Sequence, residues 1–448
     1  FFKGHLMKTI TRNEFIVISL MLFSMFFGAG NFIFPPMLGK ESGEIFYQTI
    51  LYFCVTAVLL PVLGVAAVAR CGSVQALTGR VDRFFGPVFI VLIYLSIGPF
   101  LAIPRAANLP FEVGVAPVVG EAKGVWLIVW SVFFFVVNYL VSINKSKLVE
   151  VLGKWLTPVL LLMIALLVIG AFVADTPPLA APSGKYATAP TSTAFLAGYD
   201  TMDAMASIVF GIVVVGVLRS FGVQDDKILV QTTIKTGIFA GALLSIIYIA
   251  LAYLGAATAG AITETANGAE ILAKSAEFLF GNAGQIILGI ALFLACITTT
   301  VGLTTSGSDY FNSLAPKISY KSWCLIFSVV SALMANIGLS GILKFGVPIL
   351  VAFYPVVIVL VVLALIDNLI DSSKLIYRAC IYITLVTGLI YSLGSVATIN
   401  GEKILPASFV ELVKQAMPFY DYGLGWVLWA IVAFCVTYII HTVLKFKQ

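Results

Sequence analysis

Long apolar runs separated by short polar segments dominate the chain from residue 15 to residue 444. A helix that crosses a membrane needs roughly 20 mainly apolar residues. Twelve windows meet that requirement, so we predict an all-α polytopic membrane protein with 12 transmembrane helices. The predicted helices lie within 15–38, 45–69, 84–104 and a little beyond, 125–143, 155–174, 191–218, 236–259, 284–306, 322–343, 345–366, 379–399 and 422–444.

Composition and charge placement support this interpretation. Hydrophobic residues make up 60% of the 448-residue chain and charged residues 10%, whereas a soluble domain carries roughly 25% charged residues. If the N-terminus is cytoplasmic, 18 of the 26 Lys and Arg residues fall on the cytoplasmic side, which predicts an even number of helices and two cytoplasmic termini. The basic residues form no stripe, so we expect no nucleic-acid partner. The first apolar run is too long for a signal peptide, and we expect it to remain as a membrane helix.

The sequence offers little material for catalysis or for a transition-metal site. Its two histidines, His5 and His441, lie near the chain ends, and no two of its six cysteines have a metal-type spacing. We therefore predict no catalytic residues, no enzyme activity and no bound cofactor.

The first predicted helix is interrupted near its middle. It carries Gly28-Ala29-Gly30-Asn31, followed by Pro35 and Pro36. Glycine weakens a helix by roughly 1 kcal/mol relative to alanine, and proline removes a backbone hydrogen bond. An unwound segment is tolerated at membrane depth only where it lines a protein or water cavity, so we predict a binding site there. Close packing of small residues against another helix is the alternative interpretation.

The sixth predicted helix carries two acidic residues, Asp200 and Asp203. An acid inside the bilayer costs at least ~2.5 kcal/mol, which makes it a candidate functional residue. Alternatively, both acids lie at the outer interface. Because helices 1 and 6 occupy matching places in two five-helix halves, they predict an inverted repeat.

The resulting domain boundaries divide the chain into five parts. They are a cytoplasmic N-terminus at 1–14, a first repeat at 15–174, an external linker at 175–190, a second repeat at 191–366, and the last two helices with a cytoplasmic C-terminus at 367–448.

Two other helices carry polar residues of interest. Helix 8 contains Thr298-Thr299-Thr300, whose hydroxyls suit a hard cation or, alternatively, bond to their own helix. Helix 3 contains Arg105 and Glu112. We predict that they belong to an external gate; the alternative for Arg105 is snorkelling to the interface.

At these residues the sequence resembles the bacterial branched-chain amino acid:cation symporter family, which belongs to the amino acid–polyamine–cation superfamily. The matching stretches are Met25–Pro36 (MFFGAGNFIFPP), Gly98–Glu112 (GPFLAIPRAANLPFE) and Gly198–Gly211 (GYDTMDAMASIVFG). The resemblance implies a LeuT-type five-plus-five inverted repeat with discontinuous helices 1 and 6. It also implies symport of leucine, isoleucine and valine with Na⁺, or with H⁺ or Li⁺, across the bacterial inner membrane.

The resemblance and the positions of the breaks together give a set of expected site residues. Substrate-binding residues are expected to be Phe27, Gly28, Ala29, Gly30, Asn31, Ile97, Phe100, Tyr199, Met202 and Asp203, with the amides of Ala29 and Gly30 holding the carboxylate. The implied Na⁺ site comprises the carbonyls of Ser24 and Phe27 with Thr298 and Thr299, and Thr300 as an alternative.

Two other functions remain open at this point: the chain can carry another small neutral amino acid or a metabolite, or form a channel. A membrane enzyme would need a second acid-bearing helix, and the sequence shows none. The sequence assigns no oligomeric state.

Overall fold

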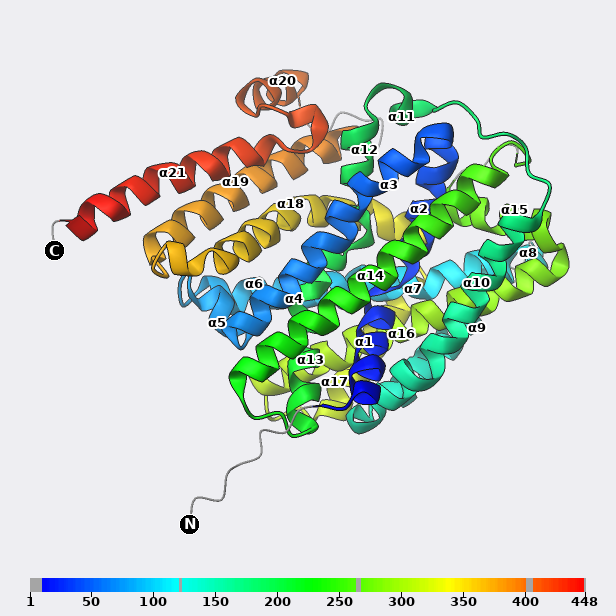
Figure 1. Ribbon diagram of the computed structural model, residues 1–448, viewed down its shortest axis with the longest axis horizontal. Coiled ribbons are helices and arrows are strands. Elements are labelled where there is room, and N and C mark those ends of the chain that lie inside the picture. Colours follow the sequence, from blue (N-terminus) through cyan, green and yellow to red (C-terminus); the bar gives the residue numbers. More distant parts are fainter. Residues whose placement is uncertain (1–9, 121–122, 263–266, 400–405, 447–448) are drawn as a thin grey trace, which may run out of the picture.

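The computed structural model describes residues 10–120, 123–262, 267–399 and 406–446. All regular secondary structure in these ranges is helical, as the apolar pattern predicts (Figure 1). The predicted cytoplasmic N-terminus therefore lies partly outside the described residues, as does His5. The first half contains α1 (Arg12–Phe26), α2 (Ala29–Ser42), α3 (Phe46–Cys54), α4 (Leu60–Cys71), α5 (Val74–Gly79), α6 (Phe85–Leu95), α7 (Ala102–Pro110), α8 (Ala116–Val119), α9 (Lys123–Ser142) and α10 (Thr157–Val173).

The rest of the chain is also helical. It contains α11 (Gly184–Thr188), α12 (Pro190–Ala197), α13 (Asp203–Ser220), α14 (Asp226–Thr258), α15 (Gly268–Phe280), α16 (Asn282–Leu314), α17 (Tyr320–Ala335), α18 (Leu339–Leu365), α19 (Lys374–Ile399), α20 (Ala407–Ala416) and α21 (Gly425–Phe446). Short π-helical turns, η2 (Val55–Leu59), η3 (Ser96–Phe100), η4 (Phe111–Val115) and η7 (Val149–Leu156), connect several of these helices.

Ten helical runs within the described residues are long and apolar enough to cross a membrane. Two of the twelve predicted spans correspond to shorter helices. Helix α1 has 15 residues and is followed after a break by α2, and α17 has 16 residues. The count of twelve crossings thus stays a prediction, whereas the all-helical architecture is confirmed.

The structure corrects several predicted boundaries. The ninth predicted helix ends at Ala335 and the tenth begins at Leu339, because Gly338 adopts a left-handed φ of 82° that interrupts the helix. The linker predicted at 175–190 is extended only in its first part, since α11 lies within it. Two segments between predicted membrane helices also contain helices, α15 and α20.

Close approach of α2 to α14 holds the first broken helix in place. A Cβ atom added at Gly39 would lie 1.9 Å from the carbonyl oxygen of Ala252, and one added at Gly255 would lie 2.1 Å from that of Pro36. Both obstacles are backbone atoms, which no side-chain rotation can move. The small residues therefore allow the two backbones to touch, as is common between membrane helices.

We expect Gly39→Ala and Gly255→Ala each to destabilise the protein by about 2 kcal/mol, since overpacking a tight interface costs roughly 1–3 kcal/mol. Thermal unfolding of the purified protein in detergent measures the change. Gly216→Ala is the matched control, because a Cβ atom there meets nothing within 4 Å. Equal melting temperatures for all three variants would contradict the packing argument.

Candidate functional site

The break in the first membrane segment lies between Phe26, where α1 ends, and Ala29, where α2 begins. The chain turns at Phe27 (φ −74°, ψ 87°) and Gly28 (φ −120°, ψ −157°). The predicted interruption is therefore confined to two residues, and the prolines lie inside α2. The first backbone N–H groups of α2 have no partner within their own helix, so the positive end of its dipole faces the break.

A second break separates α12 from α13 at Gly198–Met202. The short 3₁₀ turn η8 (Tyr199–Thr201) fills it, and Met202 takes a left-handed φ of 68°. Such a backbone conformation is strained for a residue with a side chain, and strain of this kind concentrates at functional sites.

Side chains from neighbouring segments satisfy the carbonyl groups at this second break. Thr56 Oγ1, in the π-turn η2, donates to the carbonyl of Phe195 at 2.7 Å, and Thr201 Oγ1 donates to that of Gly198 at 2.9 Å. On the other side, the N–H of Ala204 donates to the hydroxyl of Tyr354 at 3.3 Å. The unwound backbone is thus held by protein groups in a place where lipid offers none.

A buried polar triad joins the two breaks. Asn31 Nδ2 donates to Asp203 Oδ2 at 2.6 Å and also to the hydroxyl of Tyr248 on α14. The Tyr248 hydroxyl donates to the same Asp203 oxygen at 3.1 Å, and the Gly28 N–H donates to Asn31 Oδ1 at 3.0 Å. All three side chains of the triad are at most 3% exposed. Asp203 is therefore buried inside the protein, where it links the two breaks.

A small cavity of ≈ 30 Å³, called the central cavity below, lies between the two breaks. This is about the volume that one water molecule occupies in the liquid. Seven of the predicted substrate-binding residues line it: Gly28, Ala29, Gly30, Asn31, Ile97, Met202 and Asp203. Its other walls come from Met25, Phe26, Ala102, Arg105, Ala106, Thr201, Ala206, Phe210, Thr299 and Leu303.

Three predicted substrate-binding residues do not line this cavity. Phe27 is buried, but its ring packs against those of Phe23 and Phe32. Tyr199 stacks on Tyr354 at 4.4 Å, beside the second break. Phe100 is 44% exposed. A kink at Gly98 (ψ −122°) changes the direction of the chain two residues before Phe100. Closeness in sequence to Ile97, which lines the cavity, therefore does not place Phe100 in the cavity wall.

Two of the three threonines on α16 reach the end of α1. The hydroxyls of Thr298 and Thr299 donate to the carbonyl of Ser24 at 3.0 and 3.2 Å. The hydroxyl of Thr300 instead donates to Ile297 on its own helix at 3.1 Å. The geometry thus brings Ser24, Thr298 and Thr299 together. Among the described residues, no group of three or more His, Cys, Asp or Glu side chains forms a transition-metal site.

Arg105 lies in the site itself. Its side chain is 4% exposed, and its Nη1 donates to the carbonyl of Asp200 at 3.0 Å. This burial excludes the alternative that Arg105 is an exposed side chain snorkelling to the interface. Within the part of the chain that the structure describes, no ion pair joins Arg105 to Glu112, which lies in η4 and is partly buried. The predicted gating role of these two residues stays a prediction.

Two larger cavities lie at opposite ends of the molecule. One of ≈ 800 Å³ lies by α2, α11 and α12 and reaches Asp200. The other, of ≈ 460 Å³, is lined mainly by residues of α13 and α16, together with Lys145. Phe26 and Phe210 line the central cavity on the side of the ≈ 460 Å³ cavity. Their rings meet edge to face at 5.2 Å.

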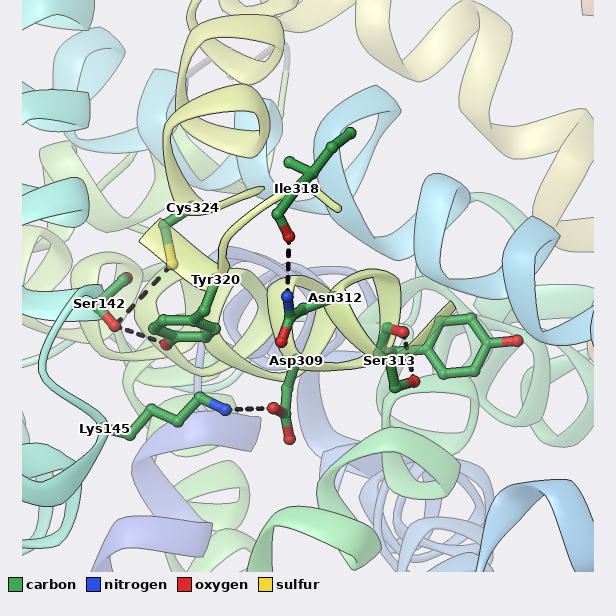
Figure 2. Close-up of polar contacts among 9 residues, drawn as sticks. Ser142, Lys145, Asp309, Asn312, Ser313, Ile318, Tyr320 and Cys324 are labelled. Carbon is green, nitrogen blue, oxygen red and sulfur yellow. Dashed lines mark hydrogen bonds and ion pairs between the residues drawn. The ribbon is translucent and has the colours of Figure 1, made fainter. Parts of the chain in front are cut away.

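Polar contacts fix the rim of the second cavity, as Figure 2 shows. Lys145 forms an ion pair with Asp309 on α16 and also lies 4.2 Å from the ring centroid of Tyr320. The Tyr320 hydroxyl donates to the carbonyl of Ser142 at 2.7 Å. These contacts tie the loop after α9 to α16 and α17.

Sequence reasoning missed two tyrosines, Tyr248 and Tyr354. Each is fully buried and hydrogen-bonds a group at a break. A tyrosine in the middle of an apolar membrane helix is a weak signal by itself, because its hydroxyl needs a partner that the sequence does not identify.

Comparisons with known proteins agree with this geometry. A family model described as "Branched-chain amino acid transport protein" matches residues 11–444. The branched-chain amino acid permease BraB of Bacillus subtilis is 40% identical over 95% of both chains. The branched-chain amino acid permease BrnQ of Escherichia coli is 34% identical over 94% of this chain and 93% of that one.

Solved structures show the same fold at low sequence identity. Mhp1, a nucleobase-cation-symport-1 family transporter in a closed conformation, is 16% identical, with a TM-score of 0.59 over 96% of this chain and 91% of its own. A manganese transporter of Eremococcus coleocola is 15% identical, with a TM-score of 0.56 over 98% of this chain and 96% of its own. The fold is thus that of LeuT-like transporters.

We expect Tyr248→Phe to lower the stability of the protein by about 1.5–3 kcal/mol, the usual contribution of a hydrogen bond to a charged group. The change keeps the ring but removes the hydroxyl that contacts Asp203 and Asn31. Chemical or thermal unfolding in detergent measures it. Tyr253→Phe on the same helix is the control, because the substitution keeps the ring that stacks on Phe172 at 4.3 Å and lies outside the triad. Equal stability of the two variants would contradict the role of the triad.

Proposed function

Because the chain belongs to the branched-chain amino acid transport protein family, we propose that it imports leucine, isoleucine and valine by alternating access, coupled to Na⁺. It is a membrane-embedded transport protein and not an enzyme. The observation that carries the proposal is the meeting of two helix breaks at one small cavity, with free N–H groups of α2 on one side and an apolar wall on the other.

The cavity suits the two parts of the substrate differently. The N–H groups of Ala29 and Gly30 at the start of α2 bind the carboxylate, because anions are stabilised at helix N-termini. The apolar wall formed by Phe26, Ile97 and Phe210 holds the branched side chain. Since the cavity has room for about one water, the substrate enters only when these walls move apart, as alternating access requires.

The Na⁺ site lies between α1 and α16. The carbonyl of Ser24 and the hydroxyls of Thr298 and Thr299 supply oxygen ligands, and the resemblance adds the carbonyl of Phe27. The hydroxyl oxygens of Thr298 and Thr299 lie 3.0 and 3.2 Å from the carbonyl oxygen of Ser24. Because this ion sits at the C-terminal end of α1 and the substrate at the N-terminal end of α2, both ligands favour the same arrangement of the break.

The proposed cellular context follows from the charge distribution. We place the protein in the bacterial inner membrane, as the family suggests, and both termini in the cytoplasm on the basis of the positive-inside count. The ≈ 460 Å³ cavity beside Lys145 and Asp309 then opens toward the cytoplasm and forms the exit path.

Thr298→Val and Thr299→Val are expected to raise the Na⁺ concentration for half-maximal leucine uptake at least tenfold, since each removes one oxygen ligand. Uptake by proteoliposomes at a series of Na⁺ concentrations measures this. Thr300→Val is the matched control, because its hydroxyl bonds to its own helix. Equal uptake with and without Na⁺ would overturn Na⁺ coupling, and dependence on a pH gradient or on Li⁺ would assign another ion.

Valine and isoleucine are expected to compete with labelled leucine with affinities within about tenfold to 200-fold of it, since an apolar pocket discriminates one methylene by only ~1–3 kcal/mol. A competition panel that includes alanine, serine and glutamine measures the preference. Stronger competition by one of those three would assign the transporter to another small neutral amino acid.

A further inference from the structure

Two opposite charges face the central cavity. Arg105 on α7 is 4% exposed and Asp203 at the start of α13 is 3% exposed. They are the only ionisable side chains among the described residues that line the cavity. Because burying a charge is expensive unless it is paired, each of them calls for an explanation.

Arg105 has few partners inside the protein. Of the five N–H groups of a guanidinium, one on Nη1 donates to the carbonyl of Asp200, and the buried Nε has no partner. None of the carboxylates in the described ranges forms an ion pair with it. Nη2 lies against the start of α2, where a Cβ atom added at Gly30 would be 2.8 Å away.

Two positive features therefore converge on one point. The guanidinium adjoins the N-terminus of α2, which carries roughly half a positive charge and free N–H groups. A cation at that end of a helix is unfavourable unless an anion lies between them. The position thus has the chemistry of a carboxylate-binding site, in which Arg offers a bidentate fork and the helix offers N–H donors.

Asp203 provides the opposite charge. Asn31 and Tyr248 both donate to its Oδ2, and Asp203 lines the cavity. The triad thus holds the carboxylate by one oxygen, and the second oxygen can accept an N–H group of a ligand. A zwitterion brings one charge of each sign and leaves the net charge of the site unchanged.

We propose that Arg105 binds the α-carboxylate of the transported amino acid together with the N–H groups of Ala29 and Gly30, while Asp203 Oδ1 binds its α-ammonium. The pair thereby selects free amino acids over amides, amines and carboxylic acids of the same shape. This assignment rests on the proposed function and gives Arg105 a binding role in place of a gating one. The competing explanation is that Arg105 only clamps the carbonyl of Asp200 and so holds the second break.

The test compares leucine with leucinamide, which keeps the ammonium and the side chain but lacks the carboxylate charge. Affinities are measured on the purified full-length chain in detergent with Na⁺, from the ligand-dependent rise in melting temperature. In Arg105→Gln the affinity for leucine is expected to fall roughly tenfold to hundredfold, and that for leucinamide less than threefold. The preference for leucine therefore shrinks.

Two variants make the comparison sharp. Arg70→Gln removes another Arg-to-carbonyl bond, that from Nη1 to Leu365 at 3.1 Å, and is expected to keep the full preference. Arg105→Lys keeps the positive charge but loses the bidentate geometry of the guanidinium. If the Gln variant does not fold, the affinities for leucine and leucinamide are compared in the Lys variant instead. An equal loss of affinity for leucine and leucinamide in the Arg105 variants would overturn the binding role in favour of the clamp.

The matching test for Asp203 uses 4-methylpentanoate, which keeps the carboxylate but lacks the ammonium. Asp203→Asn is expected to reduce the preference for leucine over this acid at least tenfold, and an unchanged preference overturns the assignment. Failure of the wild-type protein to bind leucine at all would contradict the proposed function. If the wild type binds leucine and the variants keep its preference for leucine over leucinamide and 4-methylpentanoate, only the roles given to Arg105 and Asp203 are contradicted.

Discussion

The structure depends on one constraint, which is that backbone N–H and C=O groups at membrane depth must find partners inside the protein. Two helices are nevertheless broken there, at Phe27–Gly28 and at Gly198–Met202. The neighbouring segments meet this need with Thr56, Tyr354, Asn31 and Arg105, each of which contacts a backbone group at a break. Much of the polar interior of the molecule follows from those two interruptions.

The breaks also explain why so many buried polar groups gather in one layer. Asp203, Asn31 and Tyr248 bond to one another where α2, α13 and α14 meet, and apolar residues such as Phe210 and Leu303 close the cavity on one side. A layer of this kind is stable only while its members stay paired, because an unpaired buried polar group is costly. A ligand that supplies the missing partners can therefore shift the arrangement of the helices.

In the proposed mechanism, ion and substrate act on the same break from opposite ends. The ion binds where α1 ends, at Ser24, and the substrate binds where α2 begins, at Ala29 and Gly30. Each ligand favours one geometry of the two half-helices, so each raises the affinity for the other by the same factor. Exit toward the side of Lys145 then requires Phe26 and Phe210, and the rim contacts, to separate.

The sequence by itself determined the membrane class, the helix order, the family resemblance and the place of both breaks. These depend on local signals: apolar runs, clustered glycines and prolines, and acids inside an apolar segment. The resemblance also singled out Ser24, Thr298 and Thr299, which the structure brings together, while the cation they are expected to bind remains a prediction. Local signals were weaker at boundaries, as the left-handed turn at Gly338 shows.

Only the tertiary structure decided which side chains face the central cavity. Tyr248 and Tyr354 come from helices without any interruption, and Arg105 lies in the cavity because a kink at Gly98 redirects its segment. The same kink precedes Phe100, which does not line the cavity. The physical reason is that the direction of a side chain on an apolar helix is set by how the helix is rotated and bent against its neighbours. That packing involves residues hundreds of positions apart, and no local pattern encodes it.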